Sequence, residues 1–529
     1  MTSHRRSFLK QLGFGAVSLG FVSSFPTCHA GLFSSHARLP RSGPESQGVS
    51  SEAIRHFLEA LRKSKHEFHS FMMLRHGHVI AEGWWSPYRA DLPHMLYSLS
   101  KSFTSTAVGF AVAEKRLTVD DHVTTLFPDD LPEKIGDNLT ALKVKDLLTM
   151  SVGHAEDSTG KLWGEQNWVR KFLSLPIQNP PGTAFLYNSG ATYMLSAIVQ
   201  KVTGQKVIDY LKHRLFAPLD IEGATWEVCP RGINTGGWGL KLRTEALAKF
   251  GQLYLQKGNW NGKQILPAAW VEKATTFKIQ QPGGSDLERL KQQSDWHQGY
   301  CYQFWRCRHH AFRGDGAFGQ FTIVMPEQDA VIAVTSESPS MQGELDLIWE
   351  HLLPSMKNDC LPANRDSQKH LTHELSSLAL APTKGQISSP TTPRISGERF
   401  KVEMNKGNVE EVSLHFQNHA CVFALKDNKG EYSVTCGLEK WTEGVTSMPG
   451  TPPKLTAGAL GPNSKVAASA TWLDENTFEM TWRFIETPHH DTVTCHFDGD
   501  KVKIEFMNSL AKLAPSHKDL RPPLVGKLG

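Results

Sequence analysis

A serine and a lysine three positions apart, Ser98 and Lys101, are the residues of this chain whose spacing is best suited to chemistry. Residues i and i+3 share one face of a helix, so the lysine amine can take the proton of the serine hydroxyl. The start of a helix also favours the resulting alkoxide, because its free N–H groups carry partial positive charge. The pair predicts a nucleophile together with its general base.

The same Ser-x-x-Lys spacing begins at Ser7, Ser158 and Ser509, so the surrounding sequence has to distinguish the four. Ser7 lies in a targeting segment, Ser158 in a loop and Ser509 near the C-terminus. Ser98 alone precedes a dense apolar pattern, which predicts a buried helix: Phe103, Ala107, Val108, Phe110, Ala111 and Val112. The alternative for Ser98 is a polar helix cap followed by a lysine that reaches water.

Composition and charge exclude several classes of protein. The sequence is 40% hydrophobic and 21% charged, which is ordinary for a globular protein. A chain of 529 residues is too long to fold around a single core. The net charge is +4, and three of these positive charges come from Arg5, Arg6 and Lys10. The sequence has no other basic run, so the charge distribution does not support nucleic-acid binding. No CxxC or HExxH motif is present, so we expect no metal and no cofactor.

Residues 1–30 resemble a twin-arginine export signal, with Arg5-Arg6 followed by an apolar stretch. Glycines interrupt that stretch, and it is too short for a permanent membrane anchor. We therefore expect a periplasmic or secreted protein. Without Cys28 seven cysteines remain, an odd number that predicts at least one thiol that is unpaired or paired with another molecule. Cys301 and Cys307 fall on one expected strand and should not bridge each other.

The apolar periodicity predicts an α+β domain over residues 41–356. A helix is expected over residues 51–63, followed by a hairpin of residues 68–74 and 78–83. Strands are expected over residues 301–307, 318–325 and 331–335, and a closing helix over residues 343–353. The pattern is typical of an antiparallel sheet flanked by helices.

A second domain of different character is expected over residues 396–529. Residues 357–395 are rich in Pro, Ser and Thr and are interpreted as a linker with one short helix. The short strand-like runs that follow predict an all-β domain, either a sandwich or a small barrel. It holds no Ser/Lys/Tyr cluster, so we expect it to pack or to dock a ligand.

Two further segments could complete a site around Ser98. Tyr187 and Asn188 stand at a loop tip before an expected helix at residues 191–202, where a tyrosine could pass a proton. The alternative is a helix cap with a packed tyrosine. Residues 313–320 supply a glycine-rich strand edge whose N–H groups could bind an oxyanion, although a plain hairpin turn fits as well.

Taken in order, these segments resemble the serine hydrolases related to class C β-lactamases, namely penicillin-binding DD-peptidases, esterases of family VIII and 6-aminohexanoate-dimer hydrolases. The resemblance covers about residues 41–356. Ser98 and Lys101 match the nucleophile motif, Tyr187 the second motif, and residues 314–316 the Lys/His-Thr-Gly motif. Residues 147–154 and 236–240 also resemble family segments.

The resemblance implies a hydrolase that cleaves an ester or amide through an acyl-enzyme. Ser98 would be acylated, Lys101 and Tyr187 would share the role of base, and the N–H groups of Ser98 and Ala317 would hold the oxyanion. Substrate contacts would come from Asn188, Ser189, Asp315, Gly316 and Trp238. A small ester, amide or peptide is the expected partner.

Two departures from the family pattern bear on the substrate. The usual Tyr-x-Asn is Tyr187-Asn188-Ser189, which offers a hydroxyl in place of an amide. The usual Lys or His of the third motif is Gly314, and whether the adjacent Arg313 replaces it is left open. The missing cation favours esters and amides over the substrates of a β-lactamase or a DD-peptidase. It also supports the alternative of a non-catalytic protein that holds a cell-wall fragment, but the intact Ser98, Lys101 and Tyr187 argue against that alternative.

Overall fold

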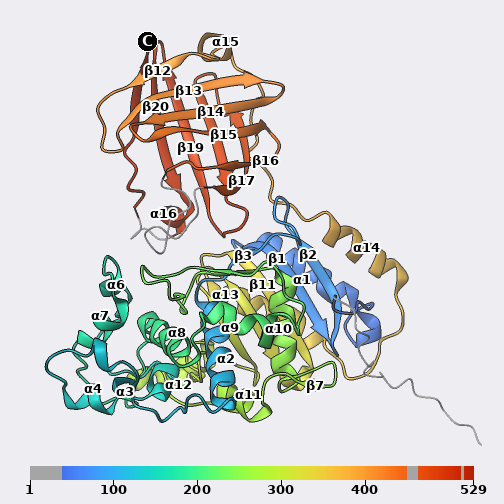
Figure 1. Ribbon diagram of the computed structural model, residues 1–529. Helices are drawn as coiled ribbons and strands as arrows, with labels where there is room; N and C mark the ends of the chain where they lie inside the picture. The colour runs from blue at the N-terminus through green and yellow to red at the C-terminus, as the bar shows by residue number, and fades with distance from the viewer. Residues whose placement is uncertain (1–37, 450–462, 514–517) are drawn as a thin grey trace, which may run out of the picture.

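The computed structural model describes residues 38–449, 463–513 and 518–529 (Figure 1). The export signal expected over residues 1–30 lies outside these residues. Figure 1 shows a domain of helices around a sheet and, beside it, a barrel of strands. The predicted fold class is confirmed: an antiparallel sheet flanked by helices, followed by an all-β C-terminal domain. None of the described helices combines the length and apolarity needed to cross a bilayer.

The first domain is built on a six-stranded sheet in the order β2-β1-β11-β10-β9-β8. Every neighbouring pair is antiparallel. The N-terminal hairpin pairs with β11, so segments from both ends of the domain complete the sheet. The strands are β1 (Glu67–Arg75), β2 (His78–Trp84), β8 (Trp305–Arg306), β9 (Phe312–Gly316), β10 (Gln320–Met325) and β11 (Ala330–Glu337).

Helices cover both faces of this sheet. Successive residues of β10 show why, because Ile323 packs into one apolar cluster and Val324 into another. One face is covered by α1 (Ser51–Lys63), α13 (Met341–Leu347) and the π-helix η7 (Ile348–Leu352). The other face carries the larger helical core, with α2 (Ser100–Ala113), α5 (Val144–Leu148), α8 (Ser189–Thr203) and α10 (Thr244–Leu255).

The strand expected over residues 301–307 is mostly irregular, which corrects the sequence prediction. Only β8 (Trp305–Arg306) pairs with β9. Gln303 interrupts the run with a left-handed backbone (φ 63°), and its side-chain amide donates to the carbonyls of Leu147 (3.1 Å) and Leu148 (2.9 Å). Cys301 and Cys307 are free thiols, in agreement with the expectation that they would not bridge.

The C-terminal domain is a ten-stranded sheet in the order β15-β14-β13-β12-β21-β20-β19-β18-β17-β16, which β15 closes by pairing with β17. Trp472, Phe478 and Trp482 fill its interior. The strands are β12 (Arg399–Val402), β13 (Val409–Gln417), β14 (Ala420–Asp427), β15 (Gly430–Leu438), β16 (Thr442–Thr446), β17 (Ser464–Trp472), β18 (Thr477–Arg483), β19 (His490–Asp498), β20 (Lys501–Asn508) and β21 (Leu524–Leu528).

The segment between the domains is attached to the first one. Helix α14 (Arg365–Ser376) runs beside α1 (Figure 1). The carboxylate of Glu374 joins the two helices by ion pairs with Arg55 (3.2 Å) and Arg62 (2.5 Å).

Candidate active site

The amine of Lys101 is the centre of the candidate site. Ser98 lies in a single 3-10 turn (Tyr97–Leu99) that leads into α2, and Lys101 lies in the first turn of that helix. Lys101 Nζ donates to Ser98 Oγ (2.9 Å), to Ser189 Oγ (3.0 Å) and to the carbonyl of Gly237 (2.8 Å). Burial lowers the pKa of Lys101 to about 7, although Asp157 and Asp315 raise it in part. The amine can therefore be neutral near physiological pH and accept a proton.

A glycine loop brings the third partner of Lys101 into place. Gly236 has a left-handed backbone (φ 68°), and a Cβ on Gly237 would lie 3.0 Å from the carbonyl oxygen of Ser189. The loop continues into Leu240, whose carbonyl accepts from Leu96 N (2.9 Å) just before the nucleophile turn. These contacts fix the loop to the segment that carries Ser98.

Tyr187 packs directly over the lysine. Its ring centre lies 4.8 Å from Lys101 Nζ, and the ring stacks on that of Trp305 at 5.6 Å. The loop is held by Leu186 N, which donates to the carbonyl of Met150 (2.8 Å). Burial raises the pKa of Tyr187 strongly, against the opposing effect of a hydrogen bond with Ser98. The phenol therefore keeps its proton at neutral pH, which suits it to donate one.

The edge of β9 lies against the nucleophile turn. A Cβ on Gly316 would come within 2.0 Å of the carbonyl oxygen of Leu96, so the strand and the turn are in close backbone contact. This contact places Ala317, the expected second oxyanion donor, beside the segment that carries Ser98. A Cβ on Gly314 would lie 2.4 Å from Leu99 Cδ1 and 2.6 Å from Ser102 Oγ. The cation that the family has at position 314 could be accommodated here only if the side chains of Leu99 and Ser102 moved aside.

Arg313 is already committed to structural contacts. The side chain is fully buried, and its guanidinium donates to Asp315 Oδ2 (3.0 Å), to the carbonyl of Asp295 (2.9 Å) and to Cys307 Sγ (3.1 Å). It also lies over the ring of Trp296 at 4.2 Å. With these partners Arg313 cannot reach a substrate carboxylate, and Asp315 is neutralised by the same pair.

Two of the expected substrate contacts point elsewhere in the structure. Asn188 caps α8: its Oδ1 accepts from Ser158 Oγ (2.7 Å) and Gly190 N (3.0 Å), while its Nδ2 pairs with His154 Nδ1 (3.0 Å). Trp238 packs on Trp168 in the helical core, with the ring centres 6.0 Å apart. Ser98, Lys101, Tyr187 and Ser189 are the expected site residues that meet around one amine.

Sequence reasoning missed Trp305 and the carbonyl of Gly237. Trp305 stacks on Tyr187 although the two are far apart in the chain, and no local pattern distinguishes it from the other tryptophans. The glycine-rich segment at residues 236–239 is visible in the sequence. A sequence does not indicate which backbone carbonyl of such a segment accepts a hydrogen bond, so the role of Gly237 could not be predicted.

Several known proteins are similar to this chain. The family model described as Beta-lactamase matches residues 56–353. The 6-aminohexanoate-dimer hydrolase of Paenarthrobacter ureafaciens is 28% identical over 51% of this chain and 72% of that protein. A Bacillus anthracis structure assigned as a 6-aminohexanoate-dimer hydrolase is similar at 20% identity and TM-score 0.48, over 64% of this chain and 88% of that one. The octameric penicillin-binding protein homologue of Pyrococcus abyssi is similar at 14% identity and TM-score 0.45, over 90% and 99% of the two chains.

Proposed function

Since the chain belongs to the beta-lactamase family of serine hydrolases, we propose that it cleaves a small ester or amide through an acyl-enzyme on Ser98. One observation carries the proposal. The Lys101 amine lies 2.9 Å from Ser98 Oγ, and burial lowers its pKa to about 7. A neutral amine at hydrogen-bonding distance from a hydroxyl is the arrangement that general-base activation of a nucleophile requires.

Acylation would proceed by proton transfer from Ser98 Oγ to Lys101 Nζ as the oxygen attacks the substrate carbonyl carbon. The tetrahedral oxyanion would be held by the N–H groups of Ser98 and Ala317. When the intermediate collapses, the bond to the leaving oxygen or nitrogen breaks, and Tyr187 protonates that atom. The proton held by Lys101 then restores the phenol of Tyr187.

Deacylation would run the same proton path in reverse. A water molecule attacks the acyl carbonyl as it gives a proton to the base formed by Lys101 and Tyr187. The acid product leaves, and Ser98 Oγ regains its proton. Ser189 supports this cycle by accepting a hydrogen bond from Lys101 Nζ (3.0 Å), which keeps the amine oriented in either protonation state.

The charge distribution favours substrates without a carboxylate beside the scissile bond. Position 314 is glycine and is packed against the side chains of Leu99 and Ser102, and the Arg313 guanidinium is used by Asp315 and Asp295. Asp157 is exposed and contacts the site through Ser189 N (3.1 Å). A β-lactam or a D-Ala-D-Ala peptide would therefore find no cation at position 314, and the exposed Asp157 adds a negative charge beside Ser189.

A substrate panel tests this preference. We expect kcat/KM for p-nitrophenyl esters and for a short linear amide to exceed that for a chromogenic cephalosporin by about ten- to a hundredfold, the value of one charge-assisted hydrogen bond. Initial rates at matched concentrations measure the ratio, and Ser98→Ala enzyme corrects for spontaneous hydrolysis. A cephalosporin turned over as fast as the esters contradicts the proposed substrate class.

The pH profile tests the role of the lysine. Because the lowered pKa of Lys101, about 7, leaves the neutral base dominant above that value, kcat/KM should rise through pH 7 and then level off. Asp157 raises this pKa, so Asp157→Asn should move the rise to lower pH, and the new amide can still accept from Ser189 N. Glu156→Gln, at an exposed neighbouring position, is the control. An unchanged profile for Asp157→Asn contradicts the assignment.

A further inference from the structure

One turn of the barrel, residues 484–489 between β18 and β19, docks on the segment that precedes the nucleophile. Met95 N donates to the carbonyl of Glu486 (3.0 Å), and Tyr88 Oη donates to the carbonyl of Thr487 (3.1 Å). Ile485 is buried in an apolar cluster with Tyr88 and Leu92. The barrel therefore touches the hydrolase domain within a few residues of Ser98.

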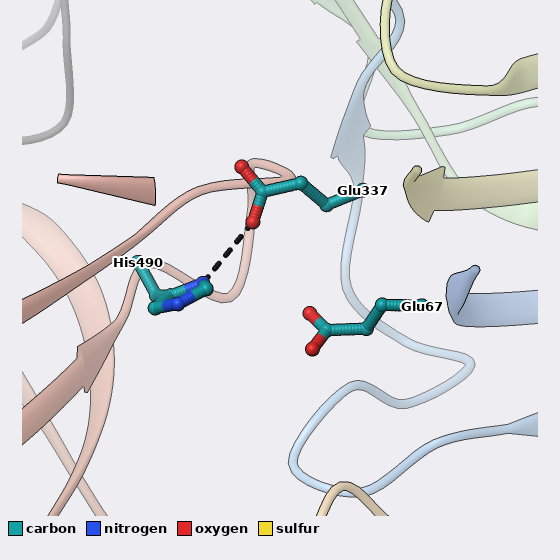
Figure 2. A group of neighbouring side chains, drawn as sticks. All are labelled: Glu67, Glu337 and His490. Atoms are coloured by element: carbon teal, nitrogen blue, oxygen red, sulfur yellow. Dashed lines mark hydrogen bonds and ion pairs between the residues drawn. The ribbon is translucent and has the colours of Figure 1, made fainter. Parts of the chain in front are cut away.

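Buried charges reinforce this contact (Figure 2). Glu337, at the end of β11, binds His489 Nδ1 (2.7 Å) and His490 Nδ1 (3.1 Å). Glu67 of β1 is held by Arg483 through both carboxylate oxygens (2.7 and 3.0 Å). Figure 2 shows the two glutamates and His490 side by side, as in a metal site. The Arg483 guanidinium already neutralises Glu67, so the group serves as a hydrogen-bonded network between the domains.

His489 extends this network to the residue before the nucleophile. Its Nδ1 donates to Glu337, which leaves Nε2 as the acceptor for the hydroxyl of Tyr97. The rings of Tyr97, His489 and Phe318 also meet edge to face, with centre separations of 5.3 Å (Tyr97–Phe318), 5.8 Å (Tyr97–His489) and 5.0 Å (Phe318–His489). The three rings form a closed cluster at the domain junction, in which Tyr97 and His489 are buried and Phe318 is half-buried.

Both partners of His489 have left-handed backbones. Tyr97 has φ 48° and Phe318 has φ 69°, in a region that bulky side chains rarely adopt. Such a conformation persists only where the surroundings hold it, and here it occurs immediately before Ser98 and immediately after Ala317. The Ser98 N–H lies in the peptide unit that follows Tyr97, so its direction depends directly on the backbone of Tyr97. Phe318 follows Ala317 and anchors the end of the segment that carries the second N–H.

We propose that His489 of the C-terminal barrel is a positioning residue for the acylation centre. Held by Glu337, it fixes Tyr97 by a hydrogen bond and Phe318 by ring contact, and so sets the two N–H groups that bind the oxyanion. The inference rests on the proposed function, and it gives the barrel a role that its sequence does not indicate. The barrel is then part of the hydrolase's catalytic geometry.

The test compares Tyr97→Phe, His489→Ala, His489→Gln and the double variant Tyr97→Phe/His489→Ala in the full chain. Tyr97→Phe removes only the hydroxyl, and we expect kcat for a p-nitrophenyl ester to fall about ten- to a hundredfold with KM within about twofold. His489→Ala should lower kcat at least as much. His489→Gln should restore much of the lost kcat, because the amide oxygen of glutamine can accept a hydrogen bond from the Tyr97 hydroxyl. The double variant should lose little more than His489→Ala alone, because one shared bond is removed.

The matched control is Arg89→Ala, which breaks an exposed ion pair between the domains, with Glu443, and should leave kcat unchanged. Circular dichroism and thermal unfolding report whether each variant is folded. Additive losses in the double variant, or a folded Tyr97→Phe enzyme with normal kcat, overturn the proposal. Labelling of Ser98 by a fluorophosphonate in the unaltered protein distinguishes failure of this inference from failure of the proposed function. If Ser98 is not labelled, both the proposed function and this inference are overturned.

Discussion

Ser98→Ala is expected to abolish ester hydrolysis, with kcat/KM lowered by at least about a thousandfold. The hydroxyl is the atom that would be acylated, and its removal leaves Ser189 Oγ bonded to the same amine. Fluorophosphonate labelling followed by mass spectrometry of the modified peptide measures the same event directly. The label should be found on Ser98 and should be absent from the variant.

Ser105→Ala is the matched control for this substitution. Ser105 lies on the same helix, is fully buried, and its hydroxyl has no hydrogen-bond partner among the described residues. Its loss should leave turnover and labelling unchanged. Ser158, the serine of the other Ser-x-x-Lys segment in the first domain, is a poor control because its hydroxyl supports the Asn188 cap. Turnover that survives in Ser98→Ala shows that the nucleophile is another residue.

The local part of the site could be predicted from the sequence because it depends on helix periodicity. Ser98 and Lys101 are three residues apart, so their contact at 2.9 Å follows once the segment is helical. The apolar pattern after Ser98 likewise predicts the buried helix α2. Burial in turn predicts the direction of the change in the pKa of Lys101, downward.

The contacts that complete the site join segments far apart in the chain. The periodicity of apolar residues predicts local helices and strands, and it does not predict such long-range contacts. Gly237 and Trp305 reach Lys101 and Tyr187 only because the loops fold together. Asn188 shows the opposite case, since a polar residue at a loop tip looked available to a substrate and is used to cap α8. His489 lies 392 positions from Tyr97, in a domain whose sequence carries no catalytic pattern.

Gly314 shows how packing and specificity are linked at one position. In the family motif this position is a Lys or His, so Gly314 removes a cation that would bind the substrate. In the fold it is required by the close approach of β9 to Leu99 and Ser102. A lysine there would have to displace the side chains of Leu99 and Ser102. The proposed preference for substrates without a carboxylate therefore follows from the packing around Gly314.

Lys101→Met is expected to lower the acylation rate by about a hundred- to ten-thousandfold, the usual value of a general base. Methionine matches the stem of the lysine but cannot accept a proton from Ser98. The rise of activity through pH 7 should disappear with the amine. The change also leaves Ser189 Oγ and the carbonyl of Gly237 without their buried donor, so we expect a loss of about 1–3 kcal/mol in the free energy of unfolding.

Lys101→Arg separates the charge of this residue from its basicity. The guanidinium keeps a positive charge and hydrogen-bond donors beside Ser98 but does not lose its proton in the accessible pH range. If Lys101 acts as the base, Lys101→Arg should be as slow as Lys101→Met, and neither should show a rise near pH 7. An active arginine variant would show that a fixed positive charge suffices, and that the proton of Ser98 leaves by another route through Tyr187. Stopped-flow measurement of the acylation phase with a p-nitrophenyl ester, repeated across pH, distinguishes these outcomes because it isolates the step in which the base acts.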